Sequence, residues 1–382
     1  MSIPASKKIY LDNAASTPVD TRVLVAMRPY FSEQFGNAGS LHRFGREAKQ
    51  ALEQSRKTIA NIIHAKATEV VFTSSATEAN NLALKGALWA SDKKKHLIVS
   101  ATEHACVLVT AQWLKEQGYG LTILPVDRYG LASVSNVKKA RRKDTVLVSV
   151  MHANNEIGTI NAIGEIGKLC RSKKILFHTD AVQTFGILPI DVNRLNIDLL
   201  TASSHKIYGP HGVGMLYVRT GVKLTPLING GGQEFGLRSG SPNIAGIVGF
   251  AKAAQIMQTE APRERKRLAV LRDMFINGVL QNISGVTLGG HPTQRTPNNT
   301  HFVFDDLLGE ALVLALDVVG IACSTGSACQ SLADEDSHVV RACELNAAGA
   351  LRFTLGRQTT KKDILCVLEV LPKVVSKLRA LS

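Results

Sequence analysis

The sequence predicts an α/β protein in which a parallel β-sheet is covered by helices, followed by a smaller α+β domain. Three observations indicate this. Short apolar segments rich in β-branched residues alternate with helical patterns between about residues 46 and 260. These segments are apolar along their whole length, which is typical of strands buried on both faces of a parallel sheet. The length of 382 residues suggests about two domains.

The elements of the first domain follow one another in a regular order. The spacing of Ala48, Leu52 and Ile59 predicts a helix over 46–63. Strands are expected at 70–73, 96–100, 121–124, 145–150, 175–179 and 198–202, and further helices at 78–90, 106–117 and 163–172. Ligands of such sheets bind at the carboxyl ends of the strands. The polar residues that follow these strands are therefore the candidates for a functional site.

A second, smaller unit is expected from about residue 261 onward. The charged segment from Thr259 to Arg267 resembles the start of a long helix that leads away from the sheet. Beyond it, residues 299–304 and 349–355 are strand-like, and residues 361–381 are helical. This mixture predicts an α+β domain. The periodicity of the first 15 residues does not decide where they pack.

Composition excludes several classes of protein. The longest apolar-rich run, Ala311 to Cys323, contains Asp317 and Gly320 and is shorter than the roughly 20 residues of a membrane-spanning helix. The first eight residues lack the apolar segment of a secretory signal. Six cysteines without a CxxC pair indicate neither a disulfide framework nor a structural zinc site. A cytoplasmic protein is therefore expected.

The chain is strongly basic, with 45 Lys and Arg against 31 Asp and Glu and a formal net charge of +14. The excess includes three clusters, at 93–95, 138–143 and 263–267. We interpret these clusters as solvated helix faces and turns. Docking of an acidic partner or a nucleic acid is the alternative, although no nucleic-acid-binding motif accompanies the clusters.

Lys206 is the first candidate for chemistry, because it directly follows the predicted strand 198–202. Small hydroxyl residues precede it, and Gly209 and Pro210 follow, so the sequence predicts a lysine held beside a crevice. Desolvation there can lower the pKa of an amine and make it nucleophilic toward an aldehyde. Taken alone, the residue fits a surface lysine better, because most lysines are of that kind.

A helix start supplies a second candidate. Ser75 and Glu78 fit a capping box at the beginning of the helix predicted over 78–90. The same helix N-terminus, with the Thr77 hydroxyl as an additional donor, could hold a phosphate group.

Two more polar residues follow strands of the same domain. Asp180 needs a cationic partner if it is buried, and either a pyridinium nitrogen or an arginine would serve. His104 is either a packed core histidine or an imidazole that stacks on a ring. Together with Lys206 and the phosphate site, these residues are the parts of a pyridoxal-phosphate site.

The cysteines divide into two groups. Small residues and Gly326 surround Cys329, which predicts a flexible loop with an accessible thiol. The cysteines in helical patterns are interpreted as buried apolar thiols, namely Cys106, Cys170, Cys343 and Cys366. Cys323 fits either description.

Motifs with specific spacing extend over nearly the whole chain. They lie at 10–15, 35–37, 73–78, 102–105, 152–158, 178–183, 203–206, 230–240, 324–329 and 351–357. With these motifs the chain resembles the cysteine desulfurases of the NifS/IscS group, in the class V branch of the fold-type I pyridoxal-phosphate aminotransferases. The resemblance implies a mostly parallel, seven-stranded sheet in a large domain, residues 16–260. It also implies a small α+β domain, formed by 1–15 and 261–382, that carries the catalytic cysteine loop.

The resemblance implies a role for each candidate residue. Lys206 would attach pyridoxal 5'-phosphate covalently, with Asp180 at the pyridinium nitrogen and His104 stacked on the ring. Other cofactor contacts would come from Ala76, Thr77, Asn155, Gln183, Ser203, His205 and, across a homodimer, Ser241. Arg352 would bind the substrate carboxylate, with Asn13 and Asn155 nearby.

The implied reaction converts L-cysteine to L-alanine and leaves a persulfide on Cys329. His104 would exchange protons with the substrate thiol or with Cys329. A protein acceptor would then take the sulfur for iron–sulfur cluster assembly, tRNA thiolation or DNA modification, and the sequence leaves this choice open. The alternatives are a selenocysteine lyase, another class V aminotransferase reaction, or a non-catalytic protein that binds nucleic acid. No membrane partner is expected.

Overall fold

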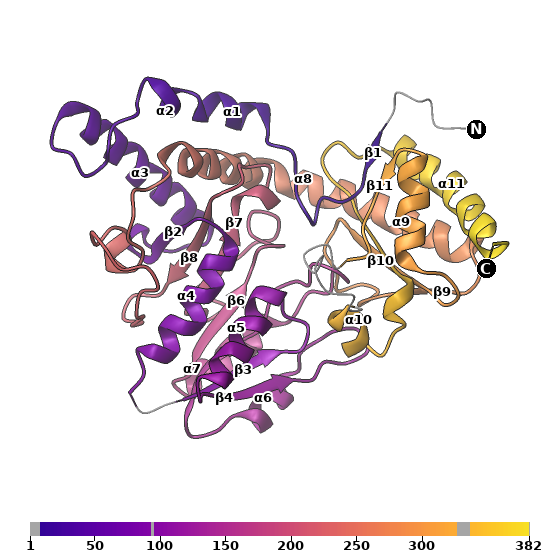
Figure 1. Ribbon diagram of the computed structural model, residues 1–382, viewed down its shortest axis with the longest axis horizontal. Coiled ribbons are helices and arrows are strands. Elements are labelled where there is room, and N and C mark those ends of the chain that lie inside the picture. Colours follow the sequence, from indigo (N-terminus) through magenta and orange to yellow (C-terminus); the bar gives the residue numbers. More distant parts are fainter. Residues whose placement is uncertain (1–7, 93–94, 327–336, 382) are drawn as a thin grey trace.

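The computed structural model describes residues 8–92, 95–326 and 337–381. A seven-stranded sheet forms the centre of the larger domain (Figure 1). Its strands, in spatial order, are β2 (Val70–Thr73), β8 (Gly214–Val218), β7 (Leu199–Ser203), β6 (Leu176–Asp180), β5 (Thr145–Ser149), β3 (His96–Ser100) and β4 (Gly120–Leu124). The sheet is mostly parallel, as the sequence predicts.

Strand β8 is the exception, because it pairs antiparallel with both β2 and β7. The sequence prediction missed this strand. Only residues 204–213 separate β8 from β7, and parallel neighbours need a longer crossover, usually with a helix. The chain therefore reverses directly and returns alongside β7.

Helices cover both faces of this sheet. On one face lie α4 (Ala76–Trp89) and α5 (Ala105–Glu116), which run in front of the sheet in Figure 1. The other face carries α3 (Arg43–Ile62), α7 (Ile163–Ser172) and part of α8 (Ile244–Asn282). Along β2, Val70 and Phe72 join one hydrophobic cluster and Val71 joins the other. This alternation explains why the strands are apolar at every position.

The smaller domain contains two further sheets. In one, β10 (Asn299–Phe304) lies between β12 (Ala350–Thr354) and β9 (Val286–Leu288), with both pairings antiparallel. In the other, β1 (Ile9–Tyr10) pairs in parallel with β11 (Ile321–Ala322). Residues 9 and 10, part of the N-terminal segment that periodicity left unplaced, therefore pack here.

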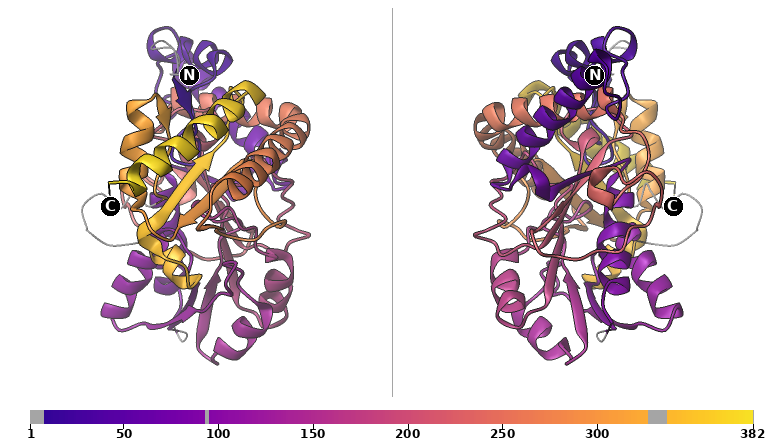
Figure 2. Two further views of the ribbon diagram at one scale, coloured as in Figure 1. Left: turned by 90° about the vertical axis from the view of Figure 1, so that its right-hand side faces the viewer. Right: turned by 90° about the vertical axis from the view of Figure 1, so that its left-hand side faces the viewer.

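Helices complete the smaller domain. They are α9 (Gly309–Val318), α10 (His338–Ala342) and α11 (Lys361–Arg379), and α11 lies beside the second half of α8 (Figure 2). The remaining α-helices of the described residues are α1 (Thr21–Met27), α2 (Pro29–Ser32) and α6 (Val134–Ala140). No helix within the described ranges combines the length and apolar character needed to cross a membrane.

Helix α8 connects the two hydrophobic cores. Phe250 belongs to the core of the larger domain, and Phe275 packs against Phe302 and Phe353 in the smaller one. The expected helix start near Thr259 was wrong, because α8 begins at Ile244. Its N-cap is Asn243, whose side chain accepts the N–H of Gly246 at 3.0 Å. The proposed boundary at residue 260 falls inside this helix and stays a prediction.

A buried ion pair fixes the loop between β8 and α8. Arg56 on α3 donates two hydrogen bonds to the Glu234 carboxylate, at 2.6 and 2.8 Å. The same carboxylate accepts the backbone N–H of Phe72 at 2.8 Å. Arg56 is 2% exposed and Glu234 is 8% exposed. The loop is thereby held against the edge strand β2.

Replacing Arg56 by alanine is expected to lower the free energy of unfolding by about 3–5 kcal/mol, since Glu234 would be left buried without its counter-charge. Urea denaturation measures the loss. The control is Arg142→Ala, because Arg142 forms an equally bidentate pair with Asp144 on the exposed surface. That loss should stay within about 1 kcal/mol. Equal losses in the two variants would contradict the role assigned to Arg56.

Candidate active site

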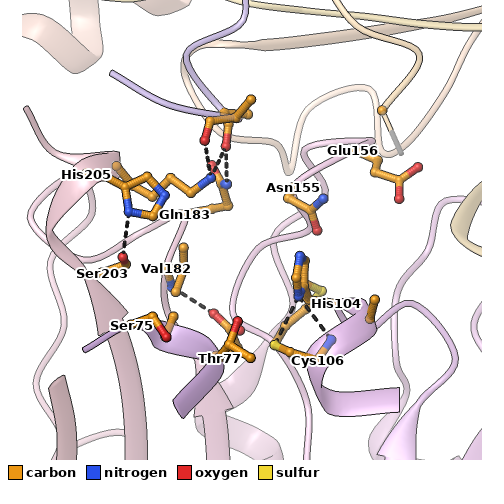
Figure 3. A pocket seen from close by; sticks show the side chains of 18 of the residues that line it. Ser75, Thr77, His104, Cys106, Asn155, Glu156, Val182, Gln183, Ser203 and His205 are labelled. Carbon is orange, nitrogen blue, oxygen red and sulfur yellow. Dashed lines mark hydrogen bonds between the residues drawn. The ribbon is translucent and has the colours of Figure 1, made fainter. Parts of the chain in front are cut away.

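A cavity of about 210 Å³ lies at the carboxyl ends of the sheet strands and is closed on one side by the smaller domain. Most of the residues predicted from the sequence line it, namely Ala76, Thr77, His104, Asn155, Asp180, Gln183, Ser203, His205, Lys206 and Arg352 (Figure 3). Asn13 and Ser241 are not among them. Cys329 lies outside the described residues.

The amine of Lys206 enters this cavity from the one-turn helix η2 (Ser204–Lys206), which directly follows β7. Its Nζ donates hydrogen bonds to the carbonyls of Ala14 and Ala15, the second at 2.7 Å. Gln183 Nε2 donates to the Ala14 carbonyl as well, at 3.1 Å. Backbone from the N-terminal segment thus holds the amine in place, as Figure 3 shows.

The N-terminus of α4 forms one end of the cavity. Ser75 is the N-cap, and its Oγ accepts the N–H of Glu78 at 3.2 Å. The predicted capping box is incomplete, because Glu78 accepts the N–H of Ser74 instead of that of Ser75. Glu78 also accepts a hydrogen bond from Arg238 Nε at 3.0 Å, which ties the loop before α8 to this helix start.

This end of the cavity fits a phosphate group. The N-terminus of a helix attracts anions, and both Ala76 and Thr77 of the first turn of α4 line the cavity. On the η2 side, Ser203 Oγ lies 2.9 Å from His205 Nδ1. Gly214 allows close packing here, since a Cβ at that position would lie 2.6 Å from the backbone of Ser75.

Asp180 ends β6 and is 4% exposed. Its two carboxylate oxygens accept hydrogen bonds from the Val182 N–H at 2.9 Å and from Asn80 Nδ2 at 2.7 Å. The sequence left an arginine or a pyridinium nitrogen as its partner. Among the described residues no arginine forms a salt bridge with Asp180, so its place in the cavity wall favours a ligand cation.

Arg352 on β12 closes the cavity from the smaller domain and is 2% exposed. Its Nη1 donates to the carbonyls of Asn155 and Gly326, at 2.9 and 3.2 Å. Its Nη2 pairs with Asp12 at 2.8 Å. The buried Nε has no partner in the protein. A guanidinium with an unused edge in a cavity is suited to bind a carboxylate.

Two predicted residues lie apart from the cavity. Asn13 donates to the Thr354 carbonyl at 2.9 Å and lines a small neighbouring cavity together with Lys206 and Gln183. Ser241 is exposed and borders a separate surface groove that includes Phe35. Within one chain, neither side chain is placed in the main cavity.

The structure also adds residues that the sequence prediction missed. Asn80, one turn after Ala76 on α4, bonds to Asp180, and its four-residue spacing from the helix start was an available signal. Cys106 was interpreted as a buried apolar thiol, and it does pack against the apolar cluster beneath α4 and α5. The interpretation did not include the cavity, which Cys106 also lines beside His104. A helical pattern alone does not show that the first turn of a helix faces a site.

Glu103 lies fully buried behind this wall. One carboxyl oxygen accepts the N–H of Met151 at 2.6 Å, and the other has no partner in the protein. Burial, together with the nearby Asp180 carboxylate, raises the pKa of Glu103 to about 8. The folded protein therefore holds this carboxyl in its protonated form at neutral pH.

The raised pKa of Glu103 predicts a dependence of stability on pH. The protonated Glu103 carboxyl makes its full contribution to the free energy of unfolding below the ordinary pKa of 4.5. This contribution is lost as the pH rises toward about 8, because Glu103 ionises in the unfolded chain before it does so in the folded protein. Glu103→Gln, which keeps the side chain neutral, should become increasingly more stable than wild type between about pH 6 and pH 8. Urea denaturation at several pH values measures this difference. The control is Glu116→Gln, at an exposed position on α5, and its free energy of unfolding should change with pH as that of wild type does. The same pH dependence in Glu103→Gln as in wild type would contradict the prediction.

Comparison with known proteins defines the class to which this fold and site belong. The family model of the class V aminotransferases matches residues 9–367. The chain belongs to that family. It is 49% identical to the cysteine desulfurase IscS of Dictyoglomus turgidum over 380 residues, 98% of this chain and 96% of that protein. It is 48% identical to the cysteine desulfurase IscS of Methanosarcina thermophila, over 99% of this chain and 94% of that protein. Within the family the chain is thus a member of the cysteine desulfurases of the NifS/IscS group.

Solved structures agree with this assignment. A NifS-like protein, 35% identical, matches with a TM-score of 0.91 over 97% of this chain and all of its own. SspA, solved in complex with cysteine, is 36% identical and matches with a TM-score of 0.81 over 91% of this chain and 99% of its own. Enzymes of this family generally depend on pyridoxal phosphate.

Proposed function

We propose that this protein removes the sulfur atom from free L-cysteine, releases L-alanine and carries the sulfur as a persulfide on Cys329. One observation carries the proposal: a single cavity brings together the Lys206 amine, the Asp180 carboxylate and the Arg352 guanidinium. These are the groups needed to hold an aldehyde cofactor, its ring nitrogen and an amino-acid carboxylate. The structural similarity to SspA, solved with cysteine, supports the choice of substrate.

The proposed cofactor is pyridoxal 5'-phosphate, with its phosphate at the N-terminus of α4 near Thr77, Ser203 and His205. When bound, it would withdraw electrons from the amino acid and so weaken the bond between Cα and its proton. Asp180 would pair with the ring nitrogen, and its hydrogen bonds from Asn80 and Val182 hold the carboxylate in place. Asn155 and Gln183 would contact the hydroxyl side of the ring.

The other residues would bind and orient the substrate. Arg352 would hold the carboxylate through its unused Nε, with the remaining guanidinium nitrogens already fixed by Asp12 and two carbonyls. Lys206 Nζ would take the Cα proton, while His104 would exchange protons with the substrate thiol or with Cys329. The Cys329 thiolate would then attack the substrate sulfur, so that an S–S bond forms as the C–S bond breaks.

A homodimer is part of the proposal. Large apolar side chains are exposed within one stretch of α1 to α3, namely Leu24, Val25, Phe31, Phe35, Leu41 and Phe44. Apolar surface of this kind is rarely left open to water and marks an interface. The groove bordered by Ser241 includes Phe31 and Phe35. Association of two copies here would allow Ser241 to reach the cofactor phosphate of the partner.

The sulfur acceptor is proposed as a protein, either an iron–sulfur scaffold or a thiolation enzyme. A cytoplasmic location remains a prediction from the sequence.

The test incubates purified protein, loaded with pyridoxal phosphate, with L-cysteine labelled with a sulfur isotope. We expect equal amounts of L-alanine and protein-bound sulfur, followed by sulfide when a thiol reductant is present. Desulfurisation restricted to L-selenocysteine would indicate the lyase alternative. Amino transfer that requires a keto acid would indicate an aminotransferase. Absence of alanine would reject the proposal.

A further inference from the structure

Cys106 has no part in the reaction proposed above, yet its thiol lies in the cavity wall beside His104. His104 is the N-cap of α5, and Cys106 is the second residue of that helix. Cys106 Sγ lies 3.0 Å from His104 Nδ1, and the backbone N–H of Cys106 donates to the same nitrogen at 3.2 Å (Figure 3). One ring nitrogen of His104 therefore has two neighbours on a single residue.

These contacts determine which nitrogen of His104 carries the proton. A backbone N–H can only donate, so Nδ1 must accept and cannot itself hold a hydrogen. A neutral imidazole with a bare Nδ1 carries its proton on Nε2. The rest of the ring points away from Cys106, toward Asn155 across the cavity (Figure 3).

The direction of the thiol hydrogen bond follows from the bare Nδ1 of His104, which can only accept. The sulfur in turn accepts from Asn80 Nδ2 at 3.1 Å, and the same amide donates to Asp180 at 2.7 Å. Thr77 is a further side-chain partner of the thiol. Burial and the Asp180 carboxylate raise the pKa of the Cys106 thiol to about 12, so the thiol keeps its proton at neutral pH.

We propose that Cys106 is a positioning residue that holds His104 as the Nε2–H tautomer, so that this imidazole presents a proton donor to the sulfur-bearing group in the cavity. The inference deepens the proposed function and rests on it. In this state Nε2 has no free lone pair, so a thiol in the cavity cannot pass a proton to it. His104 therefore begins the reaction as a hydrogen-bond donor, which stabilises a thiolate in the cavity without giving up its own proton.

The groups around His104 come from several elements. Burial lowers the pKa of His104, and Lys206 on η2 and His338 on α10 act in the same direction, whereas Asp180 on β6 opposes them. Glu103, next in the chain, is held neutral. Against this background a second donor to Nδ1 makes protonation of His104 harder still. Removal of the thiol should therefore raise the pKa of His104.

The test uses the full-length protein loaded with pyridoxal phosphate and labelled with ¹⁵N-histidine. The His104 signals are identified by their loss in His104→Gln. We expect the Nε2–H tautomer in wild type at neutral pH. Cys106→Ala should raise the pKa of His104 by about one unit, whereas Cys106→Ser, which retains a donor, should stay close to wild type. Cys170→Ala removes a buried thiol on α7 and serves as the matched control with no change.

An Nδ1–H tautomer in wild type, or an unchanged pKa of His104 in Cys106→Ala, would overturn the proposal. The NMR signals do not require turnover. Failure to form alanine, with the Nε2–H tautomer still present, would therefore count against the proposed function and leave the assigned tautomer in place.

Discussion

Replacing Lys206 by alanine is expected to slow alanine formation from L-cysteine by about 10³-fold or more, because two contributions are lost together. The amine is the proposed attachment point of the cofactor and the proposed acceptor of the Cα proton. It is also the only lysine among the cavity residues that the structure describes. No neighbouring amine is placed to replace it.

A second measurement tests the attachment of the cofactor by itself. Borohydride reduction should fix the cofactor irreversibly to wild type and leave it removable from Lys206→Ala. Lys168→Ala, which removes an exposed lysine from α7, is the matched control and should keep full activity. A Lys206→Ala protein that retained a tenth of the wild-type rate would show that another group acts in its place.

Cys329→Ser is expected to abolish protein-bound sulfur and to lower sulfide release by at least about 10²-fold, since only a thiolate is a competent nucleophile toward sulfur. Cys329 lies outside the described residues, but the described neighbours of its segment are at the cavity. Gly326 lines the cavity, and Ser337 donates a hydrogen bond to Glu156 in its wall. His338 bonds to the Glu103 carbonyl at 2.9 Å.

The controls for this variant test cofactor binding and thiol identity. Cys329→Ser should bind pyridoxal phosphate and L-cysteine like wild type, because none of the proposed cofactor contacts is changed. Cys366→Ser on α11 changes a half-buried thiol of the smaller domain and should leave sulfide release intact. Sulfide release from Cys329→Ser at the wild-type rate would remove Cys329 from the proposed reaction.

The sequence determined the parallel part of the sheet and the convergence of its polar residues. Apolar strands that alternate with helices form a parallel sheet, and its strands end at one edge. Lys206, Asp180 and His104 each follow such a strand, so their meeting in one cavity was predictable before the structure. The place of Thr77 in the cavity wall was predictable for the same reason, because a strand leads directly into the helix start.

Only the tertiary structure decided the contacts that cross between elements. The carbonyls of Ala14 and Ala15 at the Lys206 amine and the bond from Asn80 to Asp180 leave no periodic signal. Each of these contacts forms only when packing of the cores has turned one face of a short segment toward the cavity. Local patterns record burial and backbone conformation, whereas the partner of a side chain is set by residues far away in the chain. Here that distance is 192 residues for Lys206 and Ala14 and 100 residues for Asn80 and Asp180.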